Sequence, residues 1–287
     1  MSLPHVAKSL AEVRDRLAPG PRVVVMTMGA LHQGHLDLVR AAREWRQGRG
    51  GQVVVTIFVN PLQFGPAEDF DAYPRTLQAD LRMLAGEGVD LVYAPSALDM
   101  YPGGEPRVTI DPGPLGEVFE GAIRPGHFAG VATVVHKLAA RLEASAAVFG
   151  RKDAQQLAVV RQMVRDLDLP WEVVSVPTRR EADGLARSSR NRYLTTGERA
   201  EALALPRGIV AGGQAAAKGA TAAQVRQAAR AALGRTEPLK LPDYLELVDP
   251  ATFQPVDDAW TGAALLIGAL KVGRTRLIDN AEVALGA

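Results

Sequence analysis

The chain has 287 residues, no cysteine and a formal net charge of +1 at pH 7. The lack of cysteine excludes disulfide scaffolds, thiolate metal sites, iron–sulfur clusters and a cysteine nucleophile. The balanced charge argues against a general nucleic-acid binder, so we expect no nucleic-acid partner. Among the 33 basic residues six are lysines, and five residues are histidines. These rare positions therefore merit separate inspection.

The longest uncharged apolar stretch lies around residues 263–270. It is far shorter than the ~20 residues that a membrane-spanning helix needs. The first residues of the chain carry charges early and have no apolar signal-peptide core. We therefore expect a cytoplasmic protein with no membrane partner.

The first part of the chain alternates apolar runs with amphipathic stretches. Apolar residues at helical spacing predict a first helix over residues 3–18. Further helices are predicted at 34–47, 74–85, 127–142 and 152–167, and strands at 22–26, 52–59, 91–93, 146–149 and 171–176. Strands that alternate with helices of this length predict an α/β fold with a doubly wound parallel sheet.

The composition changes after about residue 184, which suggests a second domain. Alanine-rich helices are predicted at 195–218 and 221–233. Residues 244–248, 263–270 and 275–278 have the pattern of a small antiparallel sheet, with a turn over 271–274. We therefore divide the chain into a larger domain, 1–184, and a smaller C-terminal α+β domain, 185–287.

The first predicted strand runs into TMGALHQGH at residues 27–35. Ligands of open parallel sheets bind beyond the carboxyl ends of the strands, and this loop lies at such an end. If the next helix begins near Gly34, His32 and His35 face one ligand beside exposed backbone amides. That combination is typical of a phosphate site with two added imidazole donors. Two unrelated loop histidines are the less favoured alternative.

Two further segments carry phosphate-binding residue types. Ser188, Ser189 and Arg190 combine hydroxyl, backbone and guanidinium donors. Lys152 is one of the rare lysines and stands where a predicted strand ends and a helix begins. Beside it, Asp153 is equally suited to accept from ribose hydroxyls or to cap the helix.

Two more loops offer groups for an uncharged or anionic ligand. Gln63 follows the second predicted strand, where an uncharged amide suits a substrate hydroxyl or carboxylate. Arg124 and His127 lie in RPGHF, at the entrance to a helix, and are candidates to meet an anion. For Gln63, a plain surface-loop position is the alternative.

Together these five segments resemble the pantoate–β-alanine ligase family, within the nucleotidyltransferases that carry an HxGH motif. The resemblance covers nearly the whole chain and includes TMGALHQGH at 27–35, FVNPLQFGPAEDFDAYPRTLQADL at 58–81, RPGHFAGVATVVHKL at 124–138, FGRKDAQQL at 149–157 and DGLARSSRN at 183–191. It implies ATP-dependent formation of pantothenate from pantoate and β-alanine, through a pantoyl adenylate, with release of pyrophosphate and AMP. It also implies a Rossmann-like sheet, a C-terminal lid, Mg²⁺ and a homodimer.

The resemblance also implies roles for individual residues. Catalysis falls to His35, His32, Lys152 and Arg190. The residues implied in ATP binding are Met28, Gly29, Ala30, Leu31, His32, Gln33, Gly34, His35, Gly150, Arg151, Lys152, Asp153, Arg179, Arg187, Ser188, Ser189 and Arg190. The residues implied in binding pantoate or β-alanine are Gln63, Gln156, Met28, Tyr73, Arg124 and His127. No protein ligand of Mg²⁺ is assigned, and Asp80 is the weak candidate.

The chain departs from the family pattern at five positions of these segments. They are Met26, Gln33, Arg151, Arg179 and Arg187. Two other functions are alternatives. A nucleotidyltransferase acting on a phosphate monoester needs basic residues where this chain has neutral glutamines, and a nucleotide-binding regulator without catalysis needs neither glutamine.

Overall fold

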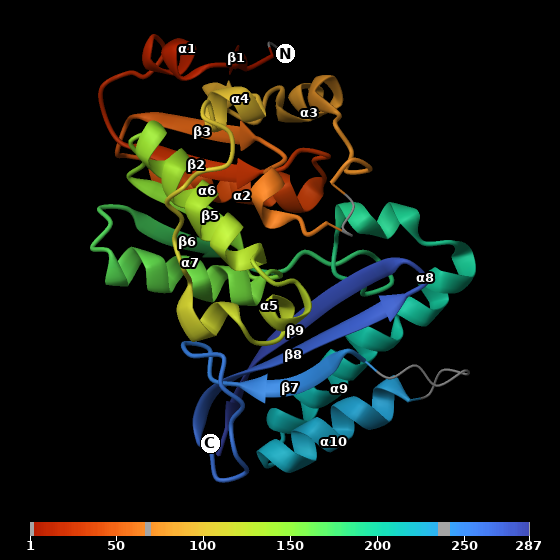
Figure 1. Ribbon diagram of the computed structural model, residues 1–287. Coiled ribbons are helices and arrows are strands. Elements are labelled where there is room, and N and C mark those ends of the chain that lie inside the picture. The colour runs from red at the N-terminus through yellow and green to blue at the C-terminus, as the bar shows by residue number, and fades with distance from the viewer. Residues whose placement is uncertain (1–2, 67–69, 235–241, 287) are drawn as a thin grey trace. The chain divides into compact units, whose positions relative to one another are not determined.

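The computed structural model describes residues 3–66, 70–234 and 242–286 (Figure 1). Contacts between residues divide the chain into two compact units. Unit 1 comprises Met1–Arg151 and Gln155–Pro177, and unit 2 comprises Lys152–Ala154 and Thr178–Ala287. Within the described residues, no helix is both long enough and apolar enough to cross a membrane.

Unit 1 is built around a six-stranded sheet in the order β1-β4-β3-β2-β5-β6. Every neighbouring pair of strands in this sheet runs parallel. The strands are β1 (His5–Ala7), β2 (Arg22–Thr27), β3 (Gln52–Ile57), β4 (Leu91–Tyr93), β5 (Ala146–Gly150) and β6 (Glu172–Val176). The predicted doubly wound parallel sheet is therefore confirmed.

The order of the strands places a topological switch point between β2 and β5. From β2 the chain adds β3 and β4 on one side, and later β5 and β6 on the other. Loops that leave adjacent strands in opposite directions open a crevice at the carboxyl ends of those strands. The segment after β2 and the end of β5 are therefore placed to bind a ligand.

Two helices of unit 1, α2 and α3, bury an apolar face against the sheet. Residues of α2 and α3 form one core cluster with alternate residues of β2 and β3, such as Val23 and Val53. Figure 1 shows α6 across the sheet, where it contacts β2. The helices and turns of this unit are α1 (Leu10–Arg14), α2 (Gln33–Arg46), η1 (Pro61–Gln63), α3 (Leu77–Leu84), α4 (Ala97–Met100), η2 (Gly113–Gly116), α5 (Glu120–Ile123), α6 (His127–Arg141) and α7 (Ala154–Asp166).

The predicted helix over 3–18 is wrong in its first part. Residues 5–7 form the edge strand β1, whose backbone pairs with β4. The helix begins only after Ser9, whose hydroxyl accepts from the Glu12 amide and caps the short α1. Pairing with a sheet edge overrides the helical spacing of the apolar residues because it satisfies the backbone of these residues.

Unit 2 packs three helices on a three-stranded antiparallel sheet of order β7-β8-β9. Its elements are η3 (Ser189–Tyr193), α8 (Thr196–Ala202), α9 (Ala204–Ala216), α10 (Ala222–Leu233), β7 (Tyr244–Val248), β8 (Gly262–Val272) and β9 (Thr275–Leu285). The single helix predicted over 195–218 is wrong, because α8 ends at Ala202 and α9 begins at Ala204. Pro206 has no amide to continue the helical hydrogen bonds across this point.

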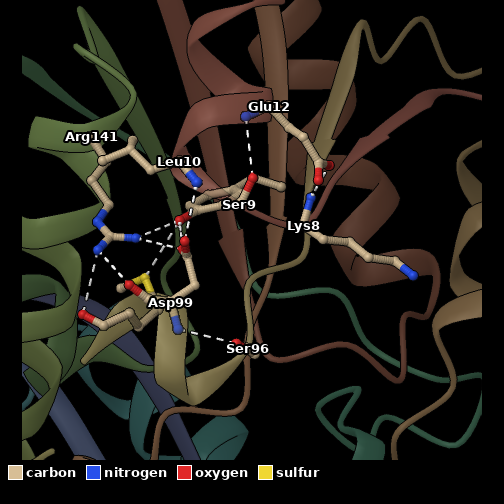
Figure 2. Close-up of polar contacts among 9 residues, drawn as sticks. Lys8, Ser9, Leu10, Glu12, Ser96, Asp99 and Arg141 are labelled. Atoms are coloured by element: carbon tan, nitrogen blue, oxygen red, sulfur yellow. Dashed lines mark hydrogen bonds and ion pairs between the residues drawn. The ribbon is translucent and has the colours of Figure 1, made fainter. Parts of the chain in front are cut away.

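A partly buried ion pair ties α4, α6 and the start of α1 together. Asp99, on α4, accepts from Arg141 of α6 at 2.7 Å and from the Leu10 amide at 3.2 Å (Figure 2). The Tyr93 hydroxyl also donates to this carboxylate. Burial opposes ionisation of Asp99, but the bonds from Tyr93, the Leu10 amide and Arg141 outweigh it and lower its pKa below the ordinary value of 3.8.

We predict that Asp99→Asn lowers the free energy of unfolding at pH 7 by about 2 kcal/mol, because a charged acceptor is lost from a partly buried site. A carboxylate with a lowered native pKa contributes stability above its unfolded pKa, and that contribution is lost as the pH falls through the native pKa. Denaturant unfolding at several pH values should therefore show the wild type and the variant converging below about pH 4. A difference that stays constant down to about pH 2 would contradict this account.

Candidate active site

The segment after β2 forms a tight turn that leads into α2. Gly29 and Ala30 both have positive φ, at 85° and 50°. This conformation is easy for glycine and costly for alanine, so the surrounding groups must hold it. The Thr27 hydroxyl accepts from the Gly29 amide at 3.2 Å. The turn brings the chain to His32, which is the N-cap of α2.

His32 and His35 lie against each other at the start of α2. Their rings are stacked, with centroids 4.0 Å apart. The backbone amide of His32 donates to Nδ1 of His35 at 3.2 Å. Since Nδ1 accepts, the neutral ring of His35 carries its proton on Nε2. The pair therefore offers an imidazole N–H donor beside the positive end of a helix dipole, where an anion is stabilised.

Asp80 holds the turn in place from α3. Its two carboxylate oxygens accept from the amides of Ala30, at 3.2 Å, and Leu31, at 2.8 Å. The Thr76 hydroxyl donates to the same carboxylate, and Asp80 is 2% exposed. From the sequence alone, Asp80 is only a weak Mg²⁺ candidate. The missed indication is that Asp80 lies on the apolar face of its helix, in line with Leu77, Leu81 and Leu84.

Gln63 and Met28 come together at the carboxyl ends of β3 and β2. Gln63, in η1, is 8% exposed, and its Nε2 lies 3.1 Å from Sδ of Met28. Asn60 donates to Oε1 of Gln63 at 3.2 Å. Two residues that the sequence predicts to bind the acid substrate are thus direct neighbours, beside the turn that leads to the histidine pair.

Arg124 and His127 hold the main chain of Gln63. Nδ1 of His127 lies 2.8 Å from the Gln63 carbonyl oxygen, and Arg124 donates to the same oxygen at 3.2 Å. Nη1 of Arg124 lies 3.1 Å from Nε2 of His127. Because the carbonyl oxygen can only accept, Nδ1 of His127 donates, and Nε2 accepts from the guanidinium. These contacts hold the main chain of Gln63 in place. Direct contact of Arg124 and His127 with a substrate stays a prediction.

Gly130 lets α6 approach this turn. A Cβ at this position would lie 2.3 Å from the Leu62 carbonyl oxygen and 2.8 Å from the Gln63 amide nitrogen. Both are main-chain atoms and cannot rotate away. Only glycine therefore allows α6 and η1 to pack at this distance.

The other predicted acid-site residues lie in the same unit. Tyr73 is buried, with its ring against Phe64 at a centroid distance of 6.0 Å. Gln156 lies in the first turn of α7 and is half-buried. Its neighbour Gln155, which sequence reasoning missed, donates to the carbonyls of Leu115 and Val118 at 2.9 and 2.8 Å. Gln155 thereby holds the segment between η2 and α5.

The end of β5 carries Gly150 and Arg151. The Arg151 amide donates to Val176, and its guanidinium donates to the Ser175 hydroxyl at 3.3 Å. One of the predicted ATP-binding arginines is thus tied to the adjacent strand β6.

Unit 2 holds the remaining predicted ATP-binding residues. Nζ of Lys152 lies 3.4 Å from Oδ1 of Asp153, and the Lys152 carbonyl accepts from Asn280 of β9 at 2.9 Å. Asn280, for which the sequence gives no indication, therefore fixes the backbone at Lys152.

The loop 179–190 is closed by its own backbone. The amide of Arg187 donates to the carbonyl of Arg179 at 2.8 Å, which pairs two residues predicted to bind ATP. Ser188 caps η3 through its hydroxyl, which accepts from the Arg190 amide at 3.2 Å, and Ser189 is the first residue of η3.

Glu181, at the base of this loop, has a lowered pKa. Burial opposes ionisation of Glu181, but bonds from Asn191 and Arg199 outweigh it and lower its pKa. Nη2 of Arg199 forms ion pairs with both Glu181, at 2.6 Å from Oε2, and Asp183, at 2.7 Å from Oδ2. This ion-pair network fixes the loop and leaves Ser188–Arg190 half-buried at its end.

The described residues contain no group of three or more His, Asp or Glu side chains that could hold a metal ion. Both oxygens of Asp80 already accept from backbone amides.

Comparison with known proteins assigns the chain to a family. A family model described as pantoate-beta-alanine ligase matches residues 4–282. The chain belongs to the pantoate–β-alanine ligase family. A pantothenate synthetase of Acidothermus cellulolyticus is 55% identical over 96% of this chain and 91% of its own length, and one of Nocardia farcinica is 54% identical over 99% and 85%. The resemblance of the sequence segments is therefore confirmed.

Solved structures agree with this assignment. A pantothenate synthetase of Thermus thermophilus superposes with a TM-score of 0.91 at 47% identity, covering 98% of this chain and 99% of that one. A pantoate-beta-alanine ligase of Francisella tularensis, complexed with beta-gamma ATP and beta-alanine, gives a TM-score of 0.76 at 30% identity, covering 97% of both chains. The family confirms the predicted fold class and the predicted ligase activity.

We predict that Asp80→Asn lowers the free energy of unfolding by about 1–2 kcal/mol and raises the KM for ATP. The new amide group faces one of the two backbone amides, and a buried donor without an acceptor carries this cost. Denaturant unfolding and initial rates at varied ATP concentration test both effects. Asp71→Asn, an exposed change in the same segment, is the control. An Asp80→Asn enzyme with normal KM for ATP would show that the turn holds its shape without the carboxylate.

Proposed function

We propose that this chain joins pantoate to β-alanine at the expense of ATP and releases AMP and pyrophosphate. The observation that carries this proposal is the stacked histidine pair at the start of α2, beside a turn whose Met28 contacts Gln63. A phosphate-binding helix end and an uncharged acid site then share one edge of the sheet. The two neutral glutamines, Gln63 and Gln156, favour a carboxylic acid over a phosphate monoester as the acceptor.

In the first half-reaction, a carboxylate oxygen of pantoate attacks the α-phosphorus of ATP. The bond from phosphorus to the bridging oxygen breaks, and pyrophosphate leaves with both electrons. In-line displacement at phosphorus needs positioning and charge stabilisation more than covalent help. The Nε2–H of His35, with His32 beside it, donates to the phosphate oxygens as charge develops there.

In the second half-reaction, the amine of β-alanine attacks the acyl carbon of pantoyl adenylate. The bond from this carbon to the phosphate oxygen breaks, AMP leaves, and the nitrogen loses a proton to give the amide. Gln63, Gln156, Met28 and Tyr73 bind pantoate in both steps, with Arg124 and His127 at the same loop. A mixed anhydride hydrolyses readily, so the site must exclude water.

The other predicted ATP-binding residues keep their roles in this proposal. Lys152, Ser188, Ser189 and Arg190 bind phosphates, and Gly150 and Asp153 lie on the ribose side. Arg151, Arg179 and Arg187 are further ATP contacts, with Arg179 and Arg187 acting through the backbone. Residues 1–184 then bind ATP and pantoate, and residues 185–287 act as a lid.

Three further properties belong to the same proposal. Mg²⁺ enters with ATP, bound largely by the phosphates, which suits a cation that keeps most of its water ligands. The enzyme is a homodimer in the cytoplasm. Its partners are the small-molecule substrates ATP, pantoate and β-alanine.

We expect purified protein to release pyrophosphate from ATP and Mg²⁺ when pantoate is added, and AMP and pantothenate when β-alanine follows. Chromatographic separation of the nucleotides, with each substrate omitted in turn, tests this. Release of ADP and orthophosphate, or turnover that ignores pantoate, would overturn the proposed function.

We predict that His35→Ala slows adenylation by roughly 10²–10³-fold, which is typical for loss of one transition-state donor. Pyrophosphate release in a single turnover measures this step. His5→Ala removes an exposed histidine on β1 and should leave the rate unchanged. Near-normal pyrophosphate release by His35→Ala would remove His35 from the mechanism.

A further inference from the structure

The amide of Asn60 has only one orientation that satisfies its main-chain neighbours. Asn60 is 1% exposed. Its Nδ2 donates to the Gly130 carbonyl at 3.1 Å, and its Oδ1 accepts from the Leu62 amide at 3.4 Å. A flipped amide would place Oδ1 against the Gly130 carbonyl oxygen and Nδ2 against the Leu62 amide. Two acceptors would then face each other, and so would two donors. Backbone groups therefore fix which end of this side chain donates.

Tyr101 adds the stronger of the two contacts to Oδ1 of Asn60. Its hydroxyl donates to this oxygen at 2.8 Å, against 3.4 Å for the Leu62 amide. Burial raises the pKa of Tyr101 to about 12, despite the opposing charge of Arg141. The phenol therefore remains a donor at neutral pH. Its ring lies near Phe58, at a centroid distance of 6.1 Å, and near the Lys137 ammonium, 5.3 Å from the ring centroid.

The fixed orientation of the Asn60 amide also fixes the orientation of the Gln63 amide. Nδ2 of Asn60 also donates to Oε1 of Gln63 at 3.2 Å. The acceptor end of Gln63 is thus engaged within the protein, and the donor end, Nε2, is directed to Sδ of Met28. A thioether is a weak acceptor, so a ligand oxygen that reaches this point gains a better hydrogen bond than the sulfur offers.

We propose that Tyr101 is a positioning residue for the acid substrate. Through Asn60 it holds the Gln63 amide with Nε2 directed to Met28, so that Gln63 donates to an acceptor oxygen of the acid that reaches this point. This inference rests on the proposed function, because it takes Gln63 as a pantoate contact. Tyr101 follows α4 and belongs to none of the sequence segments that carry the family resemblance.

Tyr101→Phe removes one hydroxyl and keeps the ring. Oδ1 of Asn60 then has only the long contact to Leu62, and both amides gain rotational freedom. We expect the KM for pantoate to rise about tenfold, which corresponds to about one hydrogen bond. The KM for ATP and kcat should change less than about twofold, because weaker substrate binding with unchanged chemistry raises KM alone.

Tyr93→Phe is the matched control. It removes the hydroxyl of another buried tyrosine, which donates to Asp99 and not to Asn60. Its KM for pantoate should equal that of the wild type, whatever stability it loses. Thermal unfolding of both variants shows whether the Tyr101→Phe effect exceeds a general loss of stability.

A double substitution separates positioning from a merely structural effect. In a Gln63→Ala background, Tyr101→Phe should raise the KM for pantoate less than about twofold further, because the group it orients is gone. An unchanged KM for pantoate in Tyr101→Phe, an equal rise in the KM for ATP, or full additivity with Gln63→Ala would each overturn the inference. A wild type that shows no pantoate-dependent pyrophosphate release would instead overturn the proposed function, and this inference with it.

Discussion

The carboxylate of Asp80 is the constraint on which the rest of the candidate site depends. It accepts from two successive amides of a turn that contains Ala30 in a left-handed conformation. That conformation is costly for alanine, and two charge-assisted hydrogen bonds in a buried place offset the cost. The direction of the chain into α2, and hence the stacking of His32 and His35, follows from this turn.

A second constraint acts on Gln63 from two directions. Its carbonyl oxygen is held by Arg124 and His127 at the start of α6. Its side-chain oxygen is held by Asn60. Main chain and side chain are thus fixed separately, which leaves the amide nitrogen as the polar atom directed toward Met28. An uncharged donor held in this way leaves no unpaired charge buried in the protein.

Much of the fold could be predicted from the sequence, because apolar runs and helical spacing report burial directly. The two failures have different causes. β1 pairs with β4, a strand far along the chain, and Pro206 breaks a helix whose composition favours continuity. In the candidate site, the motif segments predict which groups bind a ligand. The residues that hold those groups, such as Asp80, Tyr101 and Asn280, act through contacts between distant segments. No local pattern specifies such contacts, although a charged residue on an apolar helix face was a readable indication for Asp80.

Gly130 illustrates how closely packing and binding are joined in this fold. The missing side chain there is what lets a core helix touch the main chain of Leu62 and Gln63. In a survey of all single substitutions, we therefore expect this position to score with Gln63, although it presents no functional group. The hydrogen atom that is the side chain of Gly130 therefore partly sets which substitutions the site tolerates. A map of ligand contacts alone would omit this residue.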